Sequence, residues 1–331
     1  MARIHCTEVN LFCPVEATTL GYYPNLGANA FFCAAFGLCA VGTIVIGIWK
    51  RTWTFATVVG AGLILETVGY ASRIQMYYNP WSDSFKTQLV CIILAPTLLC
   101  AGIYLTLKHV ARVVGPTLSR IRPRLYPWIF LPFDIFCLCL QAIGGGIDAA
   151  ATANPDDVNF RMLDAGNGII IAGIVLQVVN LAVFGALSAD FFYAAWKHFR
   201  STSPAASGED EDPGRQIWTS RRFRIFCSSI AAAYVGILAR CIYRIAEMAG
   251  GWGNPIMRDE ISYIVLEATL VLYASILLTV FAPGLFFPEM GSGSSLKPLE
   301  KQTDQESVSR NENENATESE TTPGVEGTKR Q

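Results

Sequence analysis

Ionisable side chains recur inside long apolar stretches of this 331-residue sequence, and their types and spacing point to chemistry. A charged group at the centre of a membrane helix costs roughly 2.5–3.5 kcal/mol on insertion scales, so it marks a contact between helices or a pathway for a polar ligand. Glu66, Tyr70 and Arg73 follow one another at i, i+4 and i+7, which places them on one face of a helix.

Three further apolar stretches carry polar stripes of the same kind. Asp134, Gln141 and Asp148 are spaced seven apart, which is two helical turns. The other two stripes are Arg240, Tyr243, Arg244 and Glu247, and then Glu260, Tyr263 and Glu267.

The elements that position these stripes are expected to be membrane-spanning helices. The chain is 52% hydrophobic and only 16% charged, below the roughly 25% charged residues usual in soluble domains. Crossing the hydrocarbon core takes about 20 apolar residues. Windows of that length are Ala28–Trp49, Trp53–Arg73, Thr87–Leu107, Tyr126–Ile147, Asn167–Tyr193, Ile225–Ile245 and Ile261–Pro283. The sequence therefore predicts an all-α membrane domain of seven transmembrane helices over residues 28–284.

Lys and Arg are divided unevenly between the two ends of these helices. The connections after the first, third and fifth helices hold thirteen of them, whereas the N-terminal segment and the other connections hold five. Because cytoplasmic loops carry the excess of positive charge, the N-terminal segment (1–27) is predicted to lie outside and the C-terminus in the cytoplasm.

With this orientation most of the polar stripes fall in the outer half of the membrane. Two interpretations stay open: a polar groove for a ligand's head group, or a network of ion pairs that braces the bundle. Residues near the helix ends also fit a third role, in which they extend to the interface. The candidate substrate-binding residues are Glu66, Tyr70, Arg73, Asp134, Gln141, Arg240, Tyr243, Arg244, Glu247, Tyr263 and Glu267.

Two features predict bends in the helices. Pro96 lies near the middle of the third helix, where it removes a backbone hydrogen bond. Gly144, Gly145 and Gly146 lie near the outer end of the fourth. These residues are candidate hinges, although Gly and Pro in membrane helices also serve packing alone.

Two segments are too polar to bury a core. Residues 201–215 (STSPAASGEDEDPGR) predict a mobile cytoplasmic loop, and residues 285–331 predict a disordered cytoplasmic tail. Cys6 and Cys13 precede the first helix, where they either form a disulfide or remain free thiols.

Several chemistries are disfavoured. The three histidines, His5, His109 and His198, lie outside the predicted helices. This argues against intramembrane zinc hydrolases, Ser-His proteases and bis-histidine haem carriers. The sequence has no P-loop and no Lys inside a predicted helix. Its net charge of −2 gives no sign of a nucleic-acid partner. We therefore expect no enzyme, metal or cofactor.

A seven-helix chain with an outside N-terminus also suggests a G-protein-coupled receptor. The third helix ends in LKHVAR without an acidic-Arg-aromatic triplet, and the seventh ends in TVFAPG without Asn-Pro-x-x-Tyr. The topology fits this class of receptor and the motifs do not.

Several motifs together resemble another family. They are YYPNLGANAFF, ETVGYASR, LAPTLLCAGIY, FDIFCLCLQAIGGG, ARCIYRIAEMAGG and EISYIVLEA, between about Tyr22 and Gly284. The chain resembles the fungal lipid-translocating exporter family, the RTA-like group named for resistance to aminocholesterol, which includes exporters of sphingoid long-chain bases.

The resemblance assigns family positions to Glu66, Gly69, Tyr70, Arg73, Pro96, Tyr104, Asp134, Gln141, Arg240, Tyr243, Arg244, Glu247, Glu260 and Tyr263. The family more often has Asp at the position of Glu267, and His-Pro-Gly where this chain has Ala282-Pro283-Gly284. The second departure is expected to affect a cytoplasmic gate or a pH response. The resemblance therefore does not identify the substrate.

The resemblance implies ATP-independent export of amphiphilic lipids, resistance to amphiphilic toxicants, and a location in the plasma membrane. Partners would be membrane lipids or amphiphilic small molecules, with cytoplasmic regulators as candidates for the tail. The ammonium of a sphingoid base suits Glu66 or Glu267, while Arg240 and Arg244 either balance these carboxylates or hold a lipid phosphate. The alternative is a seven-helix sensor or receptor for the same amphiphiles.

Overall fold

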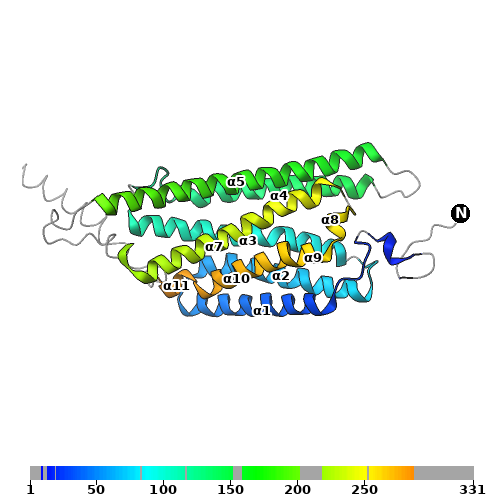
Figure 1. Cartoon of the computed structure of the whole chain (residues 1–331), viewed down its shortest axis with the longest axis horizontal. Coiled ribbons are helices and arrows are strands. Elements are labelled where there is room, and N and C mark those ends of the chain that lie inside the picture. The colour runs from blue at the N-terminus through cyan, green and yellow to red at the C-terminus, as the bar shows by residue number, and fades with distance from the viewer. Residues whose placement is uncertain are drawn as a thin grey trace, which may run out of the picture.

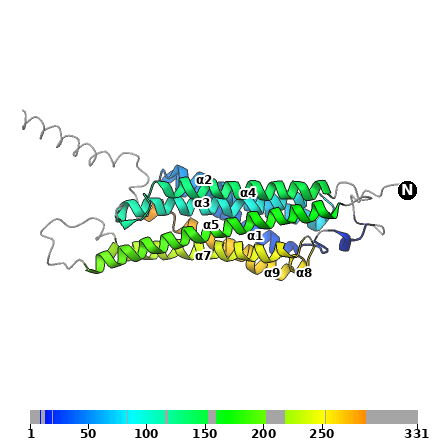
Figure 2. The same ribbon diagram turned by 90° about the horizontal axis from the view of Figure 1, so that it is seen from above.

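The fold is a bundle of long helices that lie side by side along one axis (Figures 1 and 2). The computed structural model describes Val9 and residues 13–18, 20–82, 84–115, 118–151, 159–201, 218–251 and 253–286. Within these residues seven helices are long and apolar enough to cross a membrane. The all-α fold and the number of predicted spans are confirmed.

The first six spans are α1 (Leu26–Trp49), α2 (Trp53–Tyr78), α3 (Ser84–Val114), α4 (Leu125–Ala151), α5 (Phe160–Ser201) and α7 (Arg221–Ala249). The seventh consists of α9 (Glu260–Ser262), η3 (Tyr263–Thr269), α10 (Leu270–Val280) and α11 (Pro283–Phe286). Within the described residues, two short helices with complete bounds lie outside the spans: η1 (Val15–Ala17) and α8 (Pro255–Arg258).

Several helices are longer than predicted, chiefly α3 and α5. The prediction that His109 and His198 lie outside the spanning helices is wrong, since α3 continues to Val114 and α5 to Ser201. Lys86, Lys108 and Lys197 also lie within these helices. A hydropathy window stops at the first charges, whereas the helix continues because its backbone hydrogen bonds remain satisfied beyond the hydrocarbon.

Neighbouring helices contact in chain order and the ring closes where α10 packs on α1. The third helix is the most enclosed, because 67% of its apolar window is buried against 28% for α1. Small residues allow close approach: a Cβ at Gly102 of α3 would overlap Val59 of α2, and one at Gly47 of α1 would overlap Ala56.

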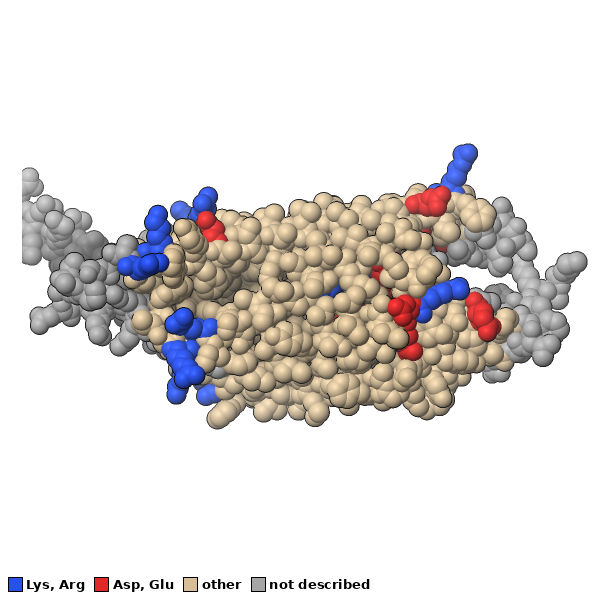
Figure 3. All heavy atoms as spheres, in the orientation of Figure 1, with Lys and Arg blue, Asp and Glu red and all other residues tan. Residues whose placement is uncertain are grey.

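The two ends of the bundle differ in charge. Figure 3 shows Lys and Arg side chains gathered at one end, with most acidic side chains at the other. The first end holds Lys50 after α1, Arg112 near the end of α3 and Arg221 at the start of α7. We call this the basic end; it is the end predicted to be cytoplasmic. The regions 202–217 and 287–331, which contain nearly all of the predicted loop and tail, lie outside the described residues.

An aromatic core fills the half of the bundle toward the basic end. Tyr104 of α3, Tyr126 and Phe130 of α4 and Phe184 of α5 pack with ring centroids 4.5–6.2 Å apart. The other half contains most of the buried charged side chains.

Candidate functional site

The polar stripes of α2, α7 and η3 converge on one buried cluster in the half of the bundle away from the basic end. We define the polar cluster as Glu66, Tyr70, Arg73, Arg240, Tyr243, Arg244, Glu247, Tyr263 and Glu267. Each of these residues is at most 9% exposed. The nine residues thus lie together, as their helical spacing predicts. Their role in substrate binding stays a prediction.

An ion pair between α7 and η3 forms the centre of the polar cluster. Arg240 Nη2 lies 2.7 Å from Glu267 Oε1. The same nitrogen donates to the backbone carbonyl of Ile92 on α3, also at 2.7 Å. One guanidinium thus connects three helices, and a buried ion pair requires such additional hydrogen bonds to offset its desolvation.

A second ion pair lies about one turn further along α7. Arg244 Nη1 is 2.6 Å from Glu247 Oε2, three residues on in the same helix. The backbone carbonyl of Glu247 accepts a hydrogen bond from the side chain of Asn254, which also caps α8. Asn254 therefore ties the connection that follows α7 back to the end of that helix.

Glu66 and Arg73 of α2 remain outside these two ion pairs. Glu66 is 1% exposed, and its Oε1 has no hydrogen-bond partner among the described residues. Arg240 is close enough to attract its charge. Arg73 contacts no carboxylate within the described part of the chain; its guanidinium lies 3.9 Å from the centroid of the Tyr263 ring. One acid and one base are thus held by weaker contacts than the paired residues.

The segment before α1 covers the end of the polar cluster that is farther from the basic end. Tyr22 accepts a hydrogen bond of 2.8 Å from Arg73, and Leu20 lines a small cavity beside Arg73 and Arg244. Burial raises the pKa of the Tyr22 phenol although Arg73 acts in the opposite direction, so Tyr22 stays neutral at physiological pH. The backbone N–H of Asn25 donates to Glu260, which joins this segment to the seventh span.

A disulfide also belongs to this segment. Cys13 is disulfide-bonded, whereas Cys6 lies outside the described residues. The eight other cysteines, all of them described, are free thiols.

A π-helical segment carries two members of the polar cluster. Tyr263 and Glu267 are the first and fifth residues of η3, the seven-residue π-helix between α9 and α10. The Thr269 hydroxyl donates to the carbonyl of Ile264, five residues earlier. Such segments are rare and frequently occur at functional sites. The wider turn sets the angle between the Tyr263 and Glu267 side chains.

Gln141 approaches the polar cluster from the opposite side. It donates to Gln177 of α5 at 3.0 Å, and Gln177 donates to Thr97 of α3 at 3.0 Å. A cavity of about 10 Å³ lies between these glutamines and the side chains of Arg240 and Arg244. Gln141 thus adjoins the cluster through this cavity.

Asp134 is not part of the polar cluster. Its two oxygens accept hydrogen bonds from Tyr104 of α3 and Asn180 of α5, both at 2.8 Å. Asn180 also donates to the carbonyl of Phe130 at 3.2 Å. These neutral donors satisfy both oxygens, so the contacts of Asp134 are those of a brace between α3, α4 and α5.

The candidate hinge residues lie within continuous helices. Pro96 is inside α3, and α4 runs without interruption through Gly144, Gly145 and Gly146. A Cβ at Gly144 would approach the backbone of Gly166 on α5 to 2.7 Å, whereas Gly145 and Gly146 face open space. The contacts of Gly144 are those of helix packing, and hinge motion stays a prediction.

Two small cavities lined by described residues touch the polar cluster. One of about 20 Å³ lies beside Arg73, Glu247 and Tyr263, and the other is the 10 Å³ cavity beside Gln141. A single water needs about 10–15 Å³. These two cavities, lined by described residues, are too small for a lipid head group, which can enter through them only if the surrounding elements move.

Several polar residues near these sites are absent from the sequence prediction. Gln177, Asn180 and Tyr22 each contact a predicted residue. Gln177 and Asn180 are three residues apart in the apolar fifth span, and this spacing was an available signal. Tyr22 precedes the first span, and no helical period applies to it.

Comparison with known proteins gives a family match over most of the chain. The sequence profile described as "RTA1 like protein" matches residues 59–290. No solved structure matches the chain.

Named relatives come from Saccharomyces cerevisiae. The sphingoid long-chain base transporter RSB1 of strain Lalvin EC1118 / Prise de mousse is 27% identical over 303 residues, covering 84% of this chain and 76% of the relative. Protein RTM1 is 30% identical over 233 residues, covering 68% and 65%. Protoporphyrin uptake protein 1 is 30% identical over 230 residues, covering 68% and 67%. Two of these names refer to the movement of amphiphilic molecules.

Proposed function

Because the chain belongs to the RTA1-like family of membrane proteins, as its motifs predict, we propose that it translocates or exports amphiphilic lipids without hydrolysing ATP. The proposed substrate class is the sphingoid long-chain base, a single ammonium on a long apolar chain. The name of the relative RSB1 supports this class. Translocation of such a substrate would also protect the cell from amphiphilic toxicants.

One observation carries the proposal: Glu66 is a buried carboxyl group that forms no ion pair with any residue in the described ranges. The other two glutamates of the polar cluster each contact an arginine. An ammonium that reaches Glu66 gains a charge-assisted hydrogen bond in a low dielectric, where such a bond is stronger than in water. Glu66 is therefore the head-group ligand in our proposal, in preference to Glu267.

The substrate path requires the polar cluster to open. The segment from Leu20 to Asn25 covers its outer end, and η3 forms one of its walls. Displacement of these two elements would open the polar groove in the outer half of the bundle, with the head group beside Glu66 and the apolar chain in lipid. We place the protein in the plasma membrane with this end outside.

The experiment is a lipid-movement assay with the purified full chain in liposomes. A fluorescent long-chain base should cross between leaflets faster with the wild-type protein than in protein-free liposomes. Glu66→Gln should reduce the protein-dependent rate on the order of tenfold, the effect of losing one charged partner of about 1.5 kcal/mol. Asp190→Asn, which removes a carboxylate from a surface ion pair at the basic end, is the matched control and should keep the rate.

Two outcomes would count against the proposal. Equal rates for Glu66→Gln and the wild type would exclude Glu66 as the head-group ligand. Binding of the base without any protein-dependent movement would favour the alternative function, a membrane sensor or receptor for amphiphiles.

A further inference from the structure

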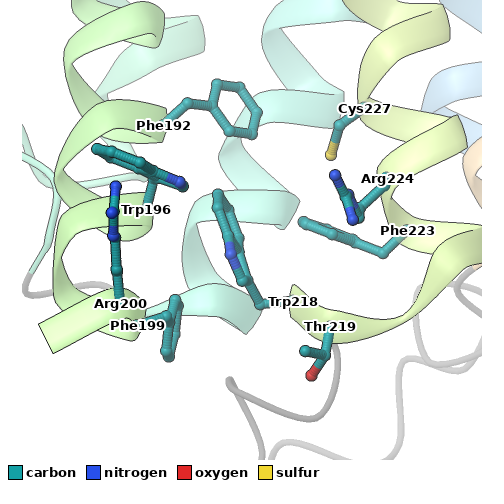
Figure 4. Close-up of a pocket in the computed structure, with 9 residues that line it drawn as sticks. All are labelled: Phe192, Trp196, Phe199, Arg200, Trp218, Thr219, Phe223, Arg224 and Cys227. Carbon is teal, nitrogen blue, oxygen red and sulfur yellow. The ribbon is translucent and has the colours of Figure 1, made fainter. Parts of the chain in front are cut away.

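A pocket of about 520 Å³ lies between α5 and α7 at the basic end, remote from the polar cluster. We call it the basal pocket. Its walls are aromatic: Phe192, Trp196 and Phe199 project from α5, and Trp218 and Phe223 come from the start of α7 and the residues before it (Figure 4). Its volume lies within the range of about 300–1,000 Å³ typical of small-molecule sites.

Among the residues that line the basal pocket, Trp218 lies between α5 and α7 (Figure 4). Its ring stacks on Phe199 of α5, with centroids 5.6 Å apart and planes inclined by 29°. Phe223 of α7 contacts the same ring at 5.8 Å. The aromatic wall is thus held in place from both sides.

Two guanidiniums line the basal pocket and lack carboxylate partners. Arg200 lies 5.0 Å from the centroid of Trp196, and Arg224 lies beside Cys227 (Figure 4). Neither forms an ion pair with any residue in the described part of the chain. The two guanidiniums lie on opposite sides of Trp218 (Figure 4), and each offers a position for an anion, since guanidinium geometry matches phosphate oxygens.

A second, apolar cavity adjoins the basal pocket. It has a volume of about 230 Å³ and shares Phe192 and Cys227 with the basal pocket. From there it extends between α3, α5 and α7 to Ile103 and Tyr234 in the membrane interior. We call it the apolar chamber. Together the two adjoining cavities offer a position for an anionic head group and, next to it, a position for an apolar chain.

We propose that the basal pocket and the apolar chamber bind an anionic phospholipid, with its phosphate on Arg224 beside the shared residue Cys227, its acyl chain in the apolar chamber, and Arg200 adding positive charge on the other side of Trp218. The location fits, because the basic end is predicted to face the anionic cytoplasmic leaflet. This ligand differs in charge from the cationic base proposed for the polar cluster.

The acidic loop of this chain is the competing occupant. Residues 202–217 connect α5 with α7 and include Glu209, Asp210, Glu211 and Asp212. Their carboxylates match the two arginines in charge. The loop sequence has no long apolar side chain from Thr202 to Gln216 and offers only Ile217, next to Trp218, whereas the acyl chain of a phospholipid matches the apolar chamber.

Native mass spectrometry of the full chain, purified in neutral detergent, tests the proposal. The probes are lysophosphatidic acid, lysophosphatidylcholine with the same acyl chain, and inorganic phosphate. We expect the wild-type protein to bind lysophosphatidic acid on the order of tenfold more tightly than the zwitterionic lipid, since each charged hydrogen bond contributes about 1.5 kcal/mol or more, which corresponds to roughly tenfold.

Three variants locate the site. Arg200→Gln with Arg224→Gln should remove the preference for the anionic lipid, and both residues are exposed, so the fold is expected to tolerate the change. Ala231→Phe, which places a ring in the apolar chamber, should weaken binding of both lipids. Arg222→Gln removes an equal charge from the same turn of α7 outside the pocket and should leave binding unchanged.

Each contrary result overturns a stated part of the proposal. Unchanged lipid preference in the double arginine variant would exclude the basal pocket as the site. Phosphate binding as tight as lipid binding would exclude the apolar chamber from recognition. A wild-type protein that binds no lipid, with binding gained once the four loop acids are neutralised, would identify the loop as the occupant.

Discussion

Glu66 and Glu267 have the same side chain, similar burial and positions in the same polar cluster, but different partners. Glu267 accepts a 2.7 Å hydrogen bond from Arg240, whereas Glu66 contacts no guanidinium directly. Removing one member of a buried ion pair leaves the other charge unpaired and destabilises a protein by about 3–5 kcal/mol. Neutralising a buried carboxylate that has no such partner removes a desolvation cost instead.

The two glutamates should therefore respond differently when each is replaced by the neutral Gln. Glu267→Gln should destabilise the protein by about 3–5 kcal/mol and reduce its abundance in the membrane. Glu66→Gln should accumulate as the wild type does. Quantitative immunoblotting of membrane fractions, together with thermal unfolding of the purified variants, measures both effects.

A paired substitution controls for the charge itself. Arg240→Met combined with Glu267→Met replaces both ions by apolar side chains and should recover much of the abundance lost in Glu267→Gln. Normal abundance of Glu267→Gln alone would contradict a bracing role for the ion pair and would indicate that water screens the remaining charge.

At the scale of single residues the sequence predicts most of the polar cluster, because helical spacing determines which polar residues share a helix face. It cannot predict which charges pair. Glu66, Glu267 and Arg240 lie on three helices, and the rotation of each helix about its axis depends on packing against its neighbours. The same limit explains why Asp134, on a predicted polar stripe, contacts Tyr104 and Asn180 instead.

At the scale of the element, η3 decides how the seventh span presents its polar side chains. A π-helix contains about one more residue per turn than an α-helix, so side chains on either side of it are rotated relative to a regular helix. Tyr263 reaches Arg73 of α2 while Glu267 reaches Arg240 of α7. No proline or glycine occurs within Tyr263–Thr269, and the sequence alone therefore predicted a regular helix here.

Deletion of Ile264 tests the role of this segment. Loss of one residue should convert η3 to an α-helix and change the angle between the Tyr263 and Glu267 side chains, while the tighter turn offsets the missing residue so that the flanking helices keep their facing sides. We expect the Arg240–Glu267 ion pair and membrane abundance to persist while the contact between Arg73 and Tyr263 is lost. Protein-dependent lipid movement in liposomes should then change, because the closure over the polar cluster depends on that contact.

A deletion in regular helix is the control. Removal of Ile276 from α10 shifts the buried residues on one side of it against α1 and α7, so it should reduce abundance. If deletion of Ile264 lowered abundance as strongly, η3 would be required for the fold rather than for the arrangement of the polar cluster.

At the scale of the molecule, the number of spans follows from composition and the helix ends do not. An apolar window reports where lipid surrounds the chain, and seven such windows correspond to seven helices. An odd number of spans puts the two ends of the membrane domain on opposite sides. Accordingly, Gly284 packs against Lys50 and Thr52 at the basic end, while Asn25 contacts Glu260 at the other.

Orientation is the last property to test, and it depends on the charge difference between these ends. Anionic lipids and the insertion machinery retain Lys- and Arg-rich connections in the cytoplasm, and the basic end carries most of these residues (Figure 3). An epitope tag after Gln331 should be accessible to antibody only in permeabilised cells, whereas a tag before His5 should be accessible in intact cells. The reverse labelling pattern would place the polar cluster beside the cytoplasm and the basal pocket outside. The proposed opening of the cluster to the outer leaflet would then be wrong, and the basal pocket would lose the cytoplasmic leaflet as its source of anionic lipid.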